Sequence, residues 1–260
     1  MVYGLPVPAM HFEASWSENH ARTKLKNRRT CRLNHRSGYS ISSAVELPFA
    51  NREAAGRLLA EELKLLRLPG DTLVLALVRG GVVIGREIAK DLRLPLYPYM
   101  VRKLGHPAHR EYGLGAIAEG GATYLDEAAM HGNGLTWEDL EPVIEEETKE
   151  LARRKQTYAV QPRPPLKGKT VILTDDGAAT GSTLFAAIDD LKNARVRHIL
   201  IALPVAPHDT LQELRKRADT AVVLATPSPF HAVGQWYREF PQVEDDQVID
   251  VLKNAATQAR

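Results

Sequence analysis

The sequence has very little cysteine and no long apolar run. Its single cysteine, Cys31, excludes an internal disulfide framework and a zinc site built from several cysteines. No stretch of about 18 consecutive apolar residues is present, which argues against a membrane span. One cysteine in 260 residues also suits a reducing compartment. We therefore expect a cytoplasmic protein with no membrane partner.

Positive charge is concentrated in the first 44 residues. This segment carries seven Lys or Arg residues against two acids, a net of +5, whereas the whole chain is +2, which leaves −3 for residues 45–260. The basic character of the chain therefore gives no reason to expect nucleic-acid binding by residues 45–260.

Residues 1–44 show neither helical nor strand periodicity, and their hydrophobic density is too low to offset the entropy of ordering. We interpret them as a disordered basic arm or as upstream sequence that is not native. A basic arm that binds nucleic acid is the alternative. The apolar region of a secretory signal is absent, and a transit peptide has only weak support. Residues 45–260 are predicted to form the folded domain.

Strands and helices alternate along the rest of the chain. Asn51 is predicted to cap a helix with an apolar stripe, and Leu73–Val78 is typical of a central parallel strand. The other predicted elements are helices over 82–91, 136–158, 183–191, 209–218 and 245–252, strands over 96–101, 170–173, 196–203 and 220–224, a hairpin around 120–121, and a loop over 102–115. This alternation predicts a parallel sheet covered by helices on both faces.

The segment Val171–Thr183 (VILTDDGAATGST) carries the clearest chemical signal. An apolar strand ends in two acids, Asp175 and Asp176, and a turn of small residues leads into a helix. Ligands of such sheets bind at the carboxyl ends of strands, and the amides of a small-residue turn and a helix start can hold an anion. The predicted anion-binding residues are Ala178, Ala179, Thr180, Gly181, Ser182 and Thr183. The lysine of a P-loop is absent.

Carboxylates beside a phosphate site would repel the anion unless they accept hydrogen bonds from sugar hydroxyls or help to hold a cation. A phosphate and two vicinal hydroxyls a few ångströms apart describe a ribose 5-phosphate. The pattern therefore indicates a sugar-phosphate ligand near Asp175 and Asp176. The alternative is a solvated acid pair followed by an ordinary helix cap.

This segment resembles the phosphoribosyl pyrophosphate signature of type I phosphoribosyltransferases, although Thr174 and Gly177 stand where aliphatic residues are commoner. The resemblance extends over residues 48–252 and is greatest to stand-alone bacterial proteins whose substrate is often unassigned. It implies an α/β fold with a mostly parallel central sheet, helices on both faces and a small hood. It also implies a homodimer that transfers a 5-phosphoribosyl group from phosphoribosyl pyrophosphate to a nitrogenous base, releasing diphosphate, with Mg2+ as cofactor.

The resemblance gives roles to two parts of the sequence. Asp175 and Asp176 correspond to the acids that position the ribose, and we expect them to hold the magnesium ion. Arg79, Gly80 and Gly81 correspond to the loop that binds the diphosphate, where glycine allows the backbone to approach closely. Without the resemblance, this arginine and glycine pair would indicate only a tight turn.

A mobile loop of the family closes over the ligand, and Arg102 and Lys103 resemble its start. Glu111 belongs to an E-Y-G like that of adenine phosphoribosyltransferases. Ala179 stands where hypoxanthine-guanine enzymes carry an aspartate, which disfavours a 6-oxopurine acceptor and makes Glu111 the candidate general base. The alternative for this segment is a solvated charged loop.

The segment Pro229–Tyr237 resembles the hood of hypoxanthine-guanine enzymes, where an aromatic ring stacks on the purine. Phe230 takes that place here. Arg238 stands where those enzymes carry an acid, so the acid's contact with the metal is not carried over. The aromatic residues of this segment could instead serve only for packing.

A second function remains open, namely a regulator that binds phosphoribosyl pyrophosphate or nucleotides without catalysis. The cations and Glu111 favour catalysis, whereas a genuine basic arm would favour a regulator that contacts nucleic acid. An unrelated Rossmann-type protein is disfavoured, because no G-x-G-x-x-G follows the first strand.

Overall fold

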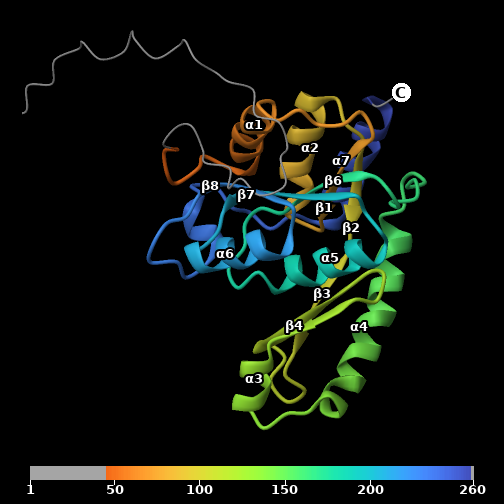
Figure 1. Ribbon diagram of the computed structural model, residues 1–260, viewed down its shortest axis with the longest axis vertical. Coiled ribbons are helices and arrows are strands. Elements are labelled where there is room, and N and C mark those ends of the chain that lie inside the picture. The colour runs from red at the N-terminus through yellow and green to blue at the C-terminus, as the bar shows by residue number, and fades with distance from the viewer. Residues whose placement is uncertain (1–44, 259–260) are drawn as a thin grey trace, which may run out of the picture.

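Five parallel strands form the central sheet of the structure, a computed structural model that describes residues 45–258. The strand order is β2–β1–β6–β7–β8 (Figure 1). The bounds are Thr72–Leu77 for β1, Leu96–Tyr99 for β2, Thr170–Thr174 for β6, His198–Val205 for β7 and Thr220–Ala225 for β8. The predicted parallel sheet is therefore confirmed, and the expectations for residues 1–44 fall outside the described residues.

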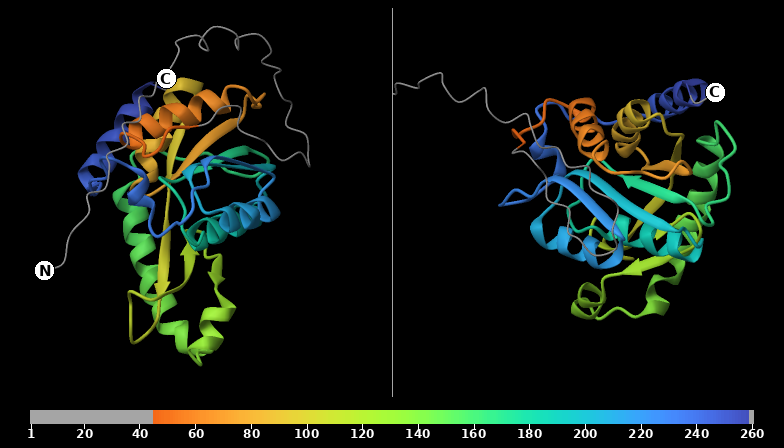
Figure 2. Two further views of the ribbon diagram at one scale, coloured as in Figure 1. Left: turned by 90° about the vertical axis from the view of Figure 1, so that its left-hand side faces the viewer. Right: turned by 45° about the horizontal axis from the view of Figure 1, so that its top comes forward.

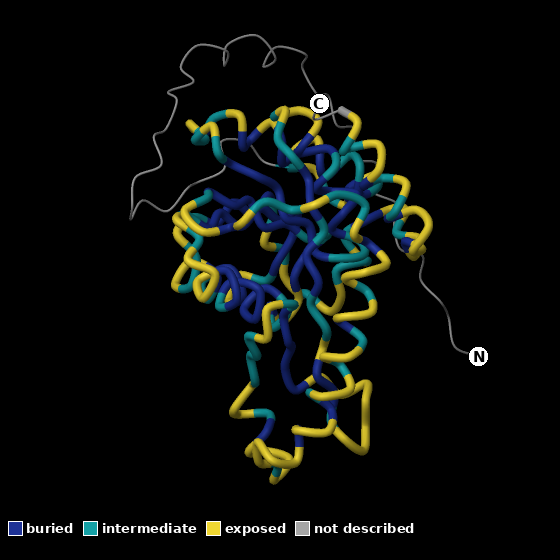
Figure 3. The backbone as a smooth tube through the Cα atoms, turned by 90° about the vertical axis from the view of Figure 1, so that its right-hand side faces the viewer, coloured by how far each residue is buried: buried dark blue, intermediate teal, exposed yellow. Residues whose placement is uncertain are grey.

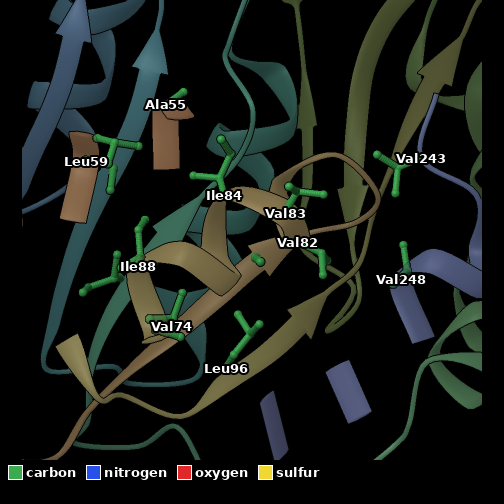
Figure 4. Close-up of a cluster of buried hydrophobic side chains, with 14 of the residues drawn as sticks. Ala55, Leu59, Val74, Val82, Val83, Ile84, Ile88, Leu96, Val243 and Val248 are labelled. Carbon is green, nitrogen blue, oxygen red and sulfur yellow. The ribbon is translucent and has the colours of Figure 1, made fainter. Parts of the chain in front are cut away.

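Helices cover both faces of this sheet (Figures 1 and 2). One face carries α1 (Arg52–Leu63), α2 (Gly81–Leu92) and α7 (Asp245–Gln258), and the other carries α5 (Ser182–Asn193) and α6 (His208–Arg217). Successive strand residues point to opposite faces, so Val74 belongs to one apolar core and Leu73 to the other. Figure 4 shows the first core, where side chains of the helices pack over Val74 and Leu96.

The predicted helix starts are confirmed at two positions. The side chain of Asn51 accepts a hydrogen bond from the amide of Ala54 at 2.9 Å, as an N-cap does. Thr136 and Asp139 form a capping box at the start of α4 (Trp137–Thr157). Within residues 45–258, no helix has the length and apolar character needed to cross a membrane.

A second, antiparallel sheet corrects the prediction for residues 96–115. Residues 96–101 do not form one strand, because β2 ends at Tyr99 and β3 (Val101–Gly105) belongs to the other sheet. The predicted loop over 102–115 is also wrong, since β3 pairs with β4 (Gly113–Ala118) and only 106–112 connect them. Charged residues and glycine have low strand propensity, and the pairing between strands overrides it here.

The second sheet forms an extension from the main body. Its third strand is β5 (Thr123–Leu125), which confirms the predicted hairpin around 120–121, and α3 (Glu127–Gly132) follows. The extension lies below the central sheet in Figure 1, with α4 along one side. Figure 3 shows that its outer end is largely exposed.

The order of the central strands defines where a ligand can bind. Strand β2 lies on one side of β1 in the sheet and β6 lies on the other, so the direction of strand addition changes at β1. Ala76 of β1 pairs with Thr174 of β6. Open α/β sheets bind ligands at such a switch point, outside the carboxyl ends of the strands. The turns after β1 and β6 therefore meet at the expected binding edge.

A buried carboxylate joins the two sheets. Asp190 of α5 is only 7% exposed and accepts hydrogen bonds from the hydroxyl of Tyr99 and, at 3.1 Å, from the amide of Gly120. A Cβ on Gly120 would lie 2.3 Å from a carboxylate oxygen of Asp190, so this turn needs glycine. Burial, and then the charge of Asp190, raises the pKa of Tyr99.

Replacing Asp190 with alanine is expected to lower the free energy of unfolding by about 3 kcal/mol, because the hydroxyl of Tyr99 and the amides of Gly120 and Ala122 lose a charged acceptor. Urea denaturation measures this change. Asp189→Ala is the matched control, since Asp189 is half-exposed and makes only a 3.6 Å contact with Arg217. Equal losses in the two variants would contradict the role given to Asp190.

Candidate functional site

The glycine turn after β1 lies directly against the acid pair after β6. A Cβ on Gly80 would stand 2.0 Å from Oδ2 of Asp176, and a Cβ on Gly81 would stand 2.9 Å from Cα of Asp175. A Cβ at Gly81 would meet backbone atoms, so only glycine fits there, whereas a Cβ at Gly80 would displace the carboxylate of Asp176. The peptide bond between Val78 and Arg79, at the start of this turn, is cis. The fold thus brings together two predicted segments that lie about a hundred residues apart.

Two helices begin at this edge without a side-chain cap. Gly80 precedes α2 and Gly181 precedes α5, and neither position offers a capping hydrogen bond. Gly181 has a φ of 83°, a left-handed conformation that favours glycine. The first amides of a helix have no partner within the helix and carry a partial positive charge. Both helix starts are therefore suited to anions.

The predicted phosphate turn is held in place by its backbone. The amide of Ala178 donates to the carbonyl of Val205 at 3.0 Å, and the hydroxyl of Thr210 on α6 donates to the carbonyl of Ala179 at 2.5 Å. The hydroxyls of Thr180 and Ser182 lie 3.1 Å apart and remain partly or fully exposed. Thr183 is likewise half-buried in the first turn of α5. The turn therefore combines a fixed backbone with accessible hydroxyl groups.

The two acids differ in their partners. Nε of Arg52 donates to Oδ2 of Asp176 at 2.8 Å. Asp175 forms no ion pair with any residue in the range 45–258, and its Oδ1 accepts from the amide of Asp176 at 2.8 Å. Burial, and then the charge of Asp176, raises the pKa of Asp175 well above its usual range. Burial also raises the pKa of Asp176, against the opposing effect of Arg52.

The sequence did not single out Arg52, the first residue of α1. Its side chain is 8% exposed, its Nη1 donates to the carbonyl of Pro241 at 2.7 Å, and its guanidinium lies 3.7 Å from the ring centre of Phe240. One sequence signal was available. A cation in the first turn of a helix is unfavourably placed in the helix dipole, so Arg52 needs another reason to be there.

Arg79 of the predicted diphosphate loop and Arg102 of the predicted mobile loop have acidic partners in the structure. Arg79 lies 3.4 Å from Glu244 and 3.5 Å from Asp245, at the start of α7. Arg102, on β3, donates to Glu147 of α4 at 2.6 Å. An incoming anion must therefore compete with carboxylates for both guanidinium groups.

Lys103 and Glu111 lie in different surroundings. Lys103 is exposed on β3, and its charge is close enough to oppose the rise in the pKa of Asp175. Glu111 is exposed in the 106–112 loop, which closes the β3–β4 hairpin at its outer end (Figure 1). The neighbouring Arg110 contacts Glu146 of α4 at 2.6 Å. The structure brings Lys103 toward the acid pair and leaves Glu111 on the extension.

The hood is formed by both ends of the described chain. The amide of Phe49 donates to the carbonyl of Trp236 at 2.8 Å, and Phe49 forms a parallel bridge with Tyr237. The hydroxyl of Tyr237 donates to the main-chain carbonyl of Asp176 at 2.5 Å. Phe230 is half-buried, with its ring centre 6.0 Å from that of Trp236. Tyr237 therefore packs as a structural residue, whereas Phe230 keeps some exposed surface.

The donor set of the site fits a hard cation only in part. Asp175 and Asp176 offer carboxylate oxygens, which Mg2+ prefers. Within residues 45–258, no group of three or more His, Cys, Asp or Glu side chains is arranged to hold a metal ion alone. Mg2+ commonly takes one or two carboxylates together with phosphate oxygens and water. The residues present therefore fit a magnesium ion that arrives with a phosphorylated ligand.

Comparisons with known proteins agree on one family. The family model of the phosphoribosyl transferase domain matches residues 51–229. Two Mycobacterium tuberculosis proteins (strains CDC 1551 / Oshkosh and H37Rv), provisionally described as phosphoribosyl transferases, are 39% identical over 209 residues. This match covers 80% of the chain but 47% of each relative, so the chain spans about half the length of the curated relatives it matches.

A solved structure is similar over its whole length. The crystal structure of TT1426 from Thermus thermophilus is 37% identical, with a TM-score of 0.68. The alignment covers 80% of this chain and 99% of that one. The central sheet, its helices and the small antiparallel sheet are thus features shared with a known fold.

Replacing Asp175 with asparagine is expected to stabilise the protein at pH 7. The pKa of Asp175 is higher in the folded protein than in the unfolded chain. Its contribution to the free energy of unfolding is therefore fully present below the unfolded-state pKa, and it is lost as the pH rises through the folded-state pKa. The variant should therefore melt at a higher temperature than the wild type at neutral pH, and the difference should shrink toward pH 4. Thermal unfolding from pH 4 to 8 in metal-free buffer measures this. A variant less stable than the wild type at pH 7 would contradict it.

Proposed function

The chain belongs to the phosphoribosyl transferase family, and from this premise we propose that it transfers a 5-phosphoribosyl group from phosphoribosyl pyrophosphate to a nitrogenous base and releases diphosphate. One observation carries the proposal. A half-buried acid pair lies between two uncapped helix starts at the switch point of a parallel sheet. A ligand with phosphates at both ends and hydroxyls between them matches this order of groups.

Each part of the ligand has a partner in the site. The turn over residues 178–183 binds the 5-phosphate through its amides and hydroxyls. Asp175 and Asp176 accept hydrogen bonds from the ribose hydroxyls. The amides of Gly80 and Gly81 bind the diphosphate, and Arg79 joins them when it exchanges its acidic partners for phosphate oxygens. Arg102 and Lys103 approach from β3.

Magnesium belongs to this proposal as a cation shared between the ligand and the acid pair, where it would neutralise charge on the diphosphate. The carboxylates of Asp175 and Asp176 are the protein groups that would hold it. Orientation and electrostatics are the protein's main contributions, because the reaction builds positive charge on the sugar while the negatively charged diphosphate departs.

In the reaction, the bond from the ribose C1 to the acceptor nitrogen forms as the bond from C1 to the diphosphate oxygen breaks. The transition state resembles an oxocarbenium ion. The acceptor nitrogen gives up a proton, and Glu111 is its proposed base. Since Glu111 lies on the exposed 106–112 loop, this role requires the loop to close over the bound ligand. The exposed part of Phe230 stacks on the base.

The same proposal includes a homodimer in the cytoplasm. The family resemblance supports the dimer, and the single cysteine supports a reducing compartment. The alternative function, a regulator that binds phosphoribosyl pyrophosphate without catalysis, shares the binding site and differs only in turnover.

Wild-type protein is expected to bind phosphoribosyl pyrophosphate with Mg2+ in isothermal titration, and the Asp175→Asn/Asp176→Asn variant is expected to lose binding by on the order of 100-fold or more. Asp91→Asn is the control, because Asp91 contacts Lys64 near the end of α2 opposite Gly80. Thermal melting shows that each variant is folded.

Absence of binding by folded wild type would sink the proposal, and equal binding by the double variant would remove the acid pair from the site. Where binding is found, release of diphosphate in the presence of a panel of bases separates the enzyme from the regulator. Turnover with one base identifies the acceptor, and binding without turnover for any base favours the regulator.

Glu111→Gln is expected to lower kcat for the identified acceptor by about 100-fold or more, with little change in the affinity for phosphoribosyl pyrophosphate, because only proton transfer is lost. Glu146→Gln on the facing helix α4 is the control, since it removes an exposed carboxylate that contacts Arg110. Full turnover by Glu111→Gln would end the assignment of Glu111 as the base.

A further inference from the structure

The amino-terminal edge of the central sheet collects cations from several loops. We propose that this edge is a surface for double-stranded nucleic acid, which it binds through the phosphate backbone and without regard to sequence. The surface is separate from the candidate catalytic site, because that site lies at the carboxyl edge of the same parallel strands. The residues of this amino-edge cluster are Arg93, Lys167, Lys169, Lys192, Arg195 and Arg197.

The fold brings the cluster together from three separate segments. Arg93 lies between α2 and β2, two lysines come just before β6, and the other three lie at the end of α5 or between α5 and β7. The amide of Gly168 donates to the carbonyl of Arg195 at 2.9 Å, and the amide of Arg197 donates to the carbonyl of Lys169 at 2.8 Å. Strands β2 and β7 are three places apart in the sheet, so the cluster extends over about 14 Å along this edge.

Most of these cations have no acidic partner. Arg197 donates to Asp71 at 2.7 Å and is still 52% exposed, whereas the other five form no ion pair within residues 45–258. The segments 161–174 and 191–208, which carry five of the six, contain no Asp or Glu. Asp219, also at this edge, accepts a hydrogen bond from the amide of Ile199 at 2.8 Å. The edge is therefore strongly positive although residues 45–260 as a whole are net acidic.

Two members of the cluster have an unfavourable backbone conformation. Arg93 has a φ of 55° and Arg195 a φ of 57°, and no other non-glycine residue of the described chain has a positive φ. Both lie at a helix end, where glycine is the common choice for this conformation. The helix dipole favours a cation there, but a cation in the last helical turn would serve it equally well. Arginine at both positions therefore indicates that a ligand uses their charge.

The chemistry of this edge favours a phosphate backbone as its partner. The large hydrophobic side chains exposed within residues 45–258 are Leu58, Tyr112 and Trp137, and none of them belongs to the loops of this edge. A membrane contact uses apolar side chains that insert, and single strands are held by aromatic rings that stack on the bases. Guanidinium and ammonium groups by themselves match the phosphates of a duplex, which carries a charge about every 1.7 Å along its axis. DNA and RNA duplexes share this chemistry.

Fluorescence anisotropy with the full chain tests the proposal, with labelled DNA and RNA duplexes of about 20 base pairs and one sequence. The test variant is Lys167→Gln/Lys169→Gln/Lys192→Gln/Arg195→Gln. The matched control removes four exposed cations from other parts of the surface, as Arg57→Gln/Lys149→Gln/Arg153→Gln/Lys253→Gln. Both variants therefore have the same net charge, and thermal melting shows that each is folded.

Wild type is expected to bind the duplexes with an affinity that falls steeply between about 50 and 200 mM salt. The test variant should bind at least about 10-fold more weakly at the lower salt concentration. Its plot of log affinity against log salt should be shallower by about 3 to 4, because up to four phosphate contacts are lost. The control variant should stay within about 3-fold of wild type, because its missing cations lie away from the amino edge.

Arg195→Gly separates binding from stability. Glycine suits a φ of 57°, so this variant should melt at or above the wild-type temperature. Its salt dependence should nevertheless be shallower by about 1, because one phosphate contact is lost. A lower melting temperature with unchanged duplex binding would mean that Arg195 serves only the helix end, and would count against the proposal.

Equal binding by the test and control variants would overturn the proposal, because the contact would then lie elsewhere in the chain, residues 1–44 included. Absence of binding to both duplexes by folded wild type would also overturn it. Vesicles that contain phosphatidylserine are titrated in parallel, and binding to them alone would make the edge a membrane contact instead. None of these results bears on the proposed transfer reaction, because the titration with phosphoribosyl pyrophosphate reports on the opposite edge of the sheet.

Discussion

Two carboxylates lie side by side at the binding edge of the central sheet, and only one of them contacts a cation. Burial and mutual repulsion raise the pKa of Asp175, which shows that the fold holds this group where its charge is unfavourable. A carboxylate in such an unfavourable position keeps its place only when the surrounding structure restrains it. Gly80 and Gly81 provide that restraint on one side, and Arg52 provides it on the other.

The two ends of the described chain complete this restraint. Residues near Phe49 pair with the backbone near Tyr237, and Arg52 reaches the carbonyl of Pro241, 189 positions away in the sequence. The residues of the hood therefore also fix the acid pair in place. A substitution that loosens the packing between Phe49 and Tyr237 would also weaken the hydrogen bond from the hydroxyl of Tyr237 to the main chain of Asp176.

Sequence patterns pointed to candidate site residues that directly follow strands. They did not point to the residues that pack against these from other parts of the fold. The order of apolar strand, acids and small residues made Asp175, Asp176 and the turn over 178–183 candidate site residues, which remains a prediction, and the apolar runs predicted the parallel sheet, which is confirmed. Arg52 and Thr210 reach the site only through the fold, so no spacing in the sequence indicated them. Strand β3 was missed because pairing with β4, and not its own composition, makes it a strand.

The charges around the site bear on how an anionic ligand is held. Arg52, Arg79 and Arg102 each contact carboxylates of the protein, so their positive charge is largely balanced before a ligand arrives. The helix starts after Gly80 and Gly181 supply only partial charges, and Asp175 adds a full negative charge. A ligand with several phosphates therefore meets little net attraction from the protein alone. A divalent cation bound to its diphosphate would turn the repulsion from Asp175 into attraction, which explains why an unpaired acid can belong to a site for anions.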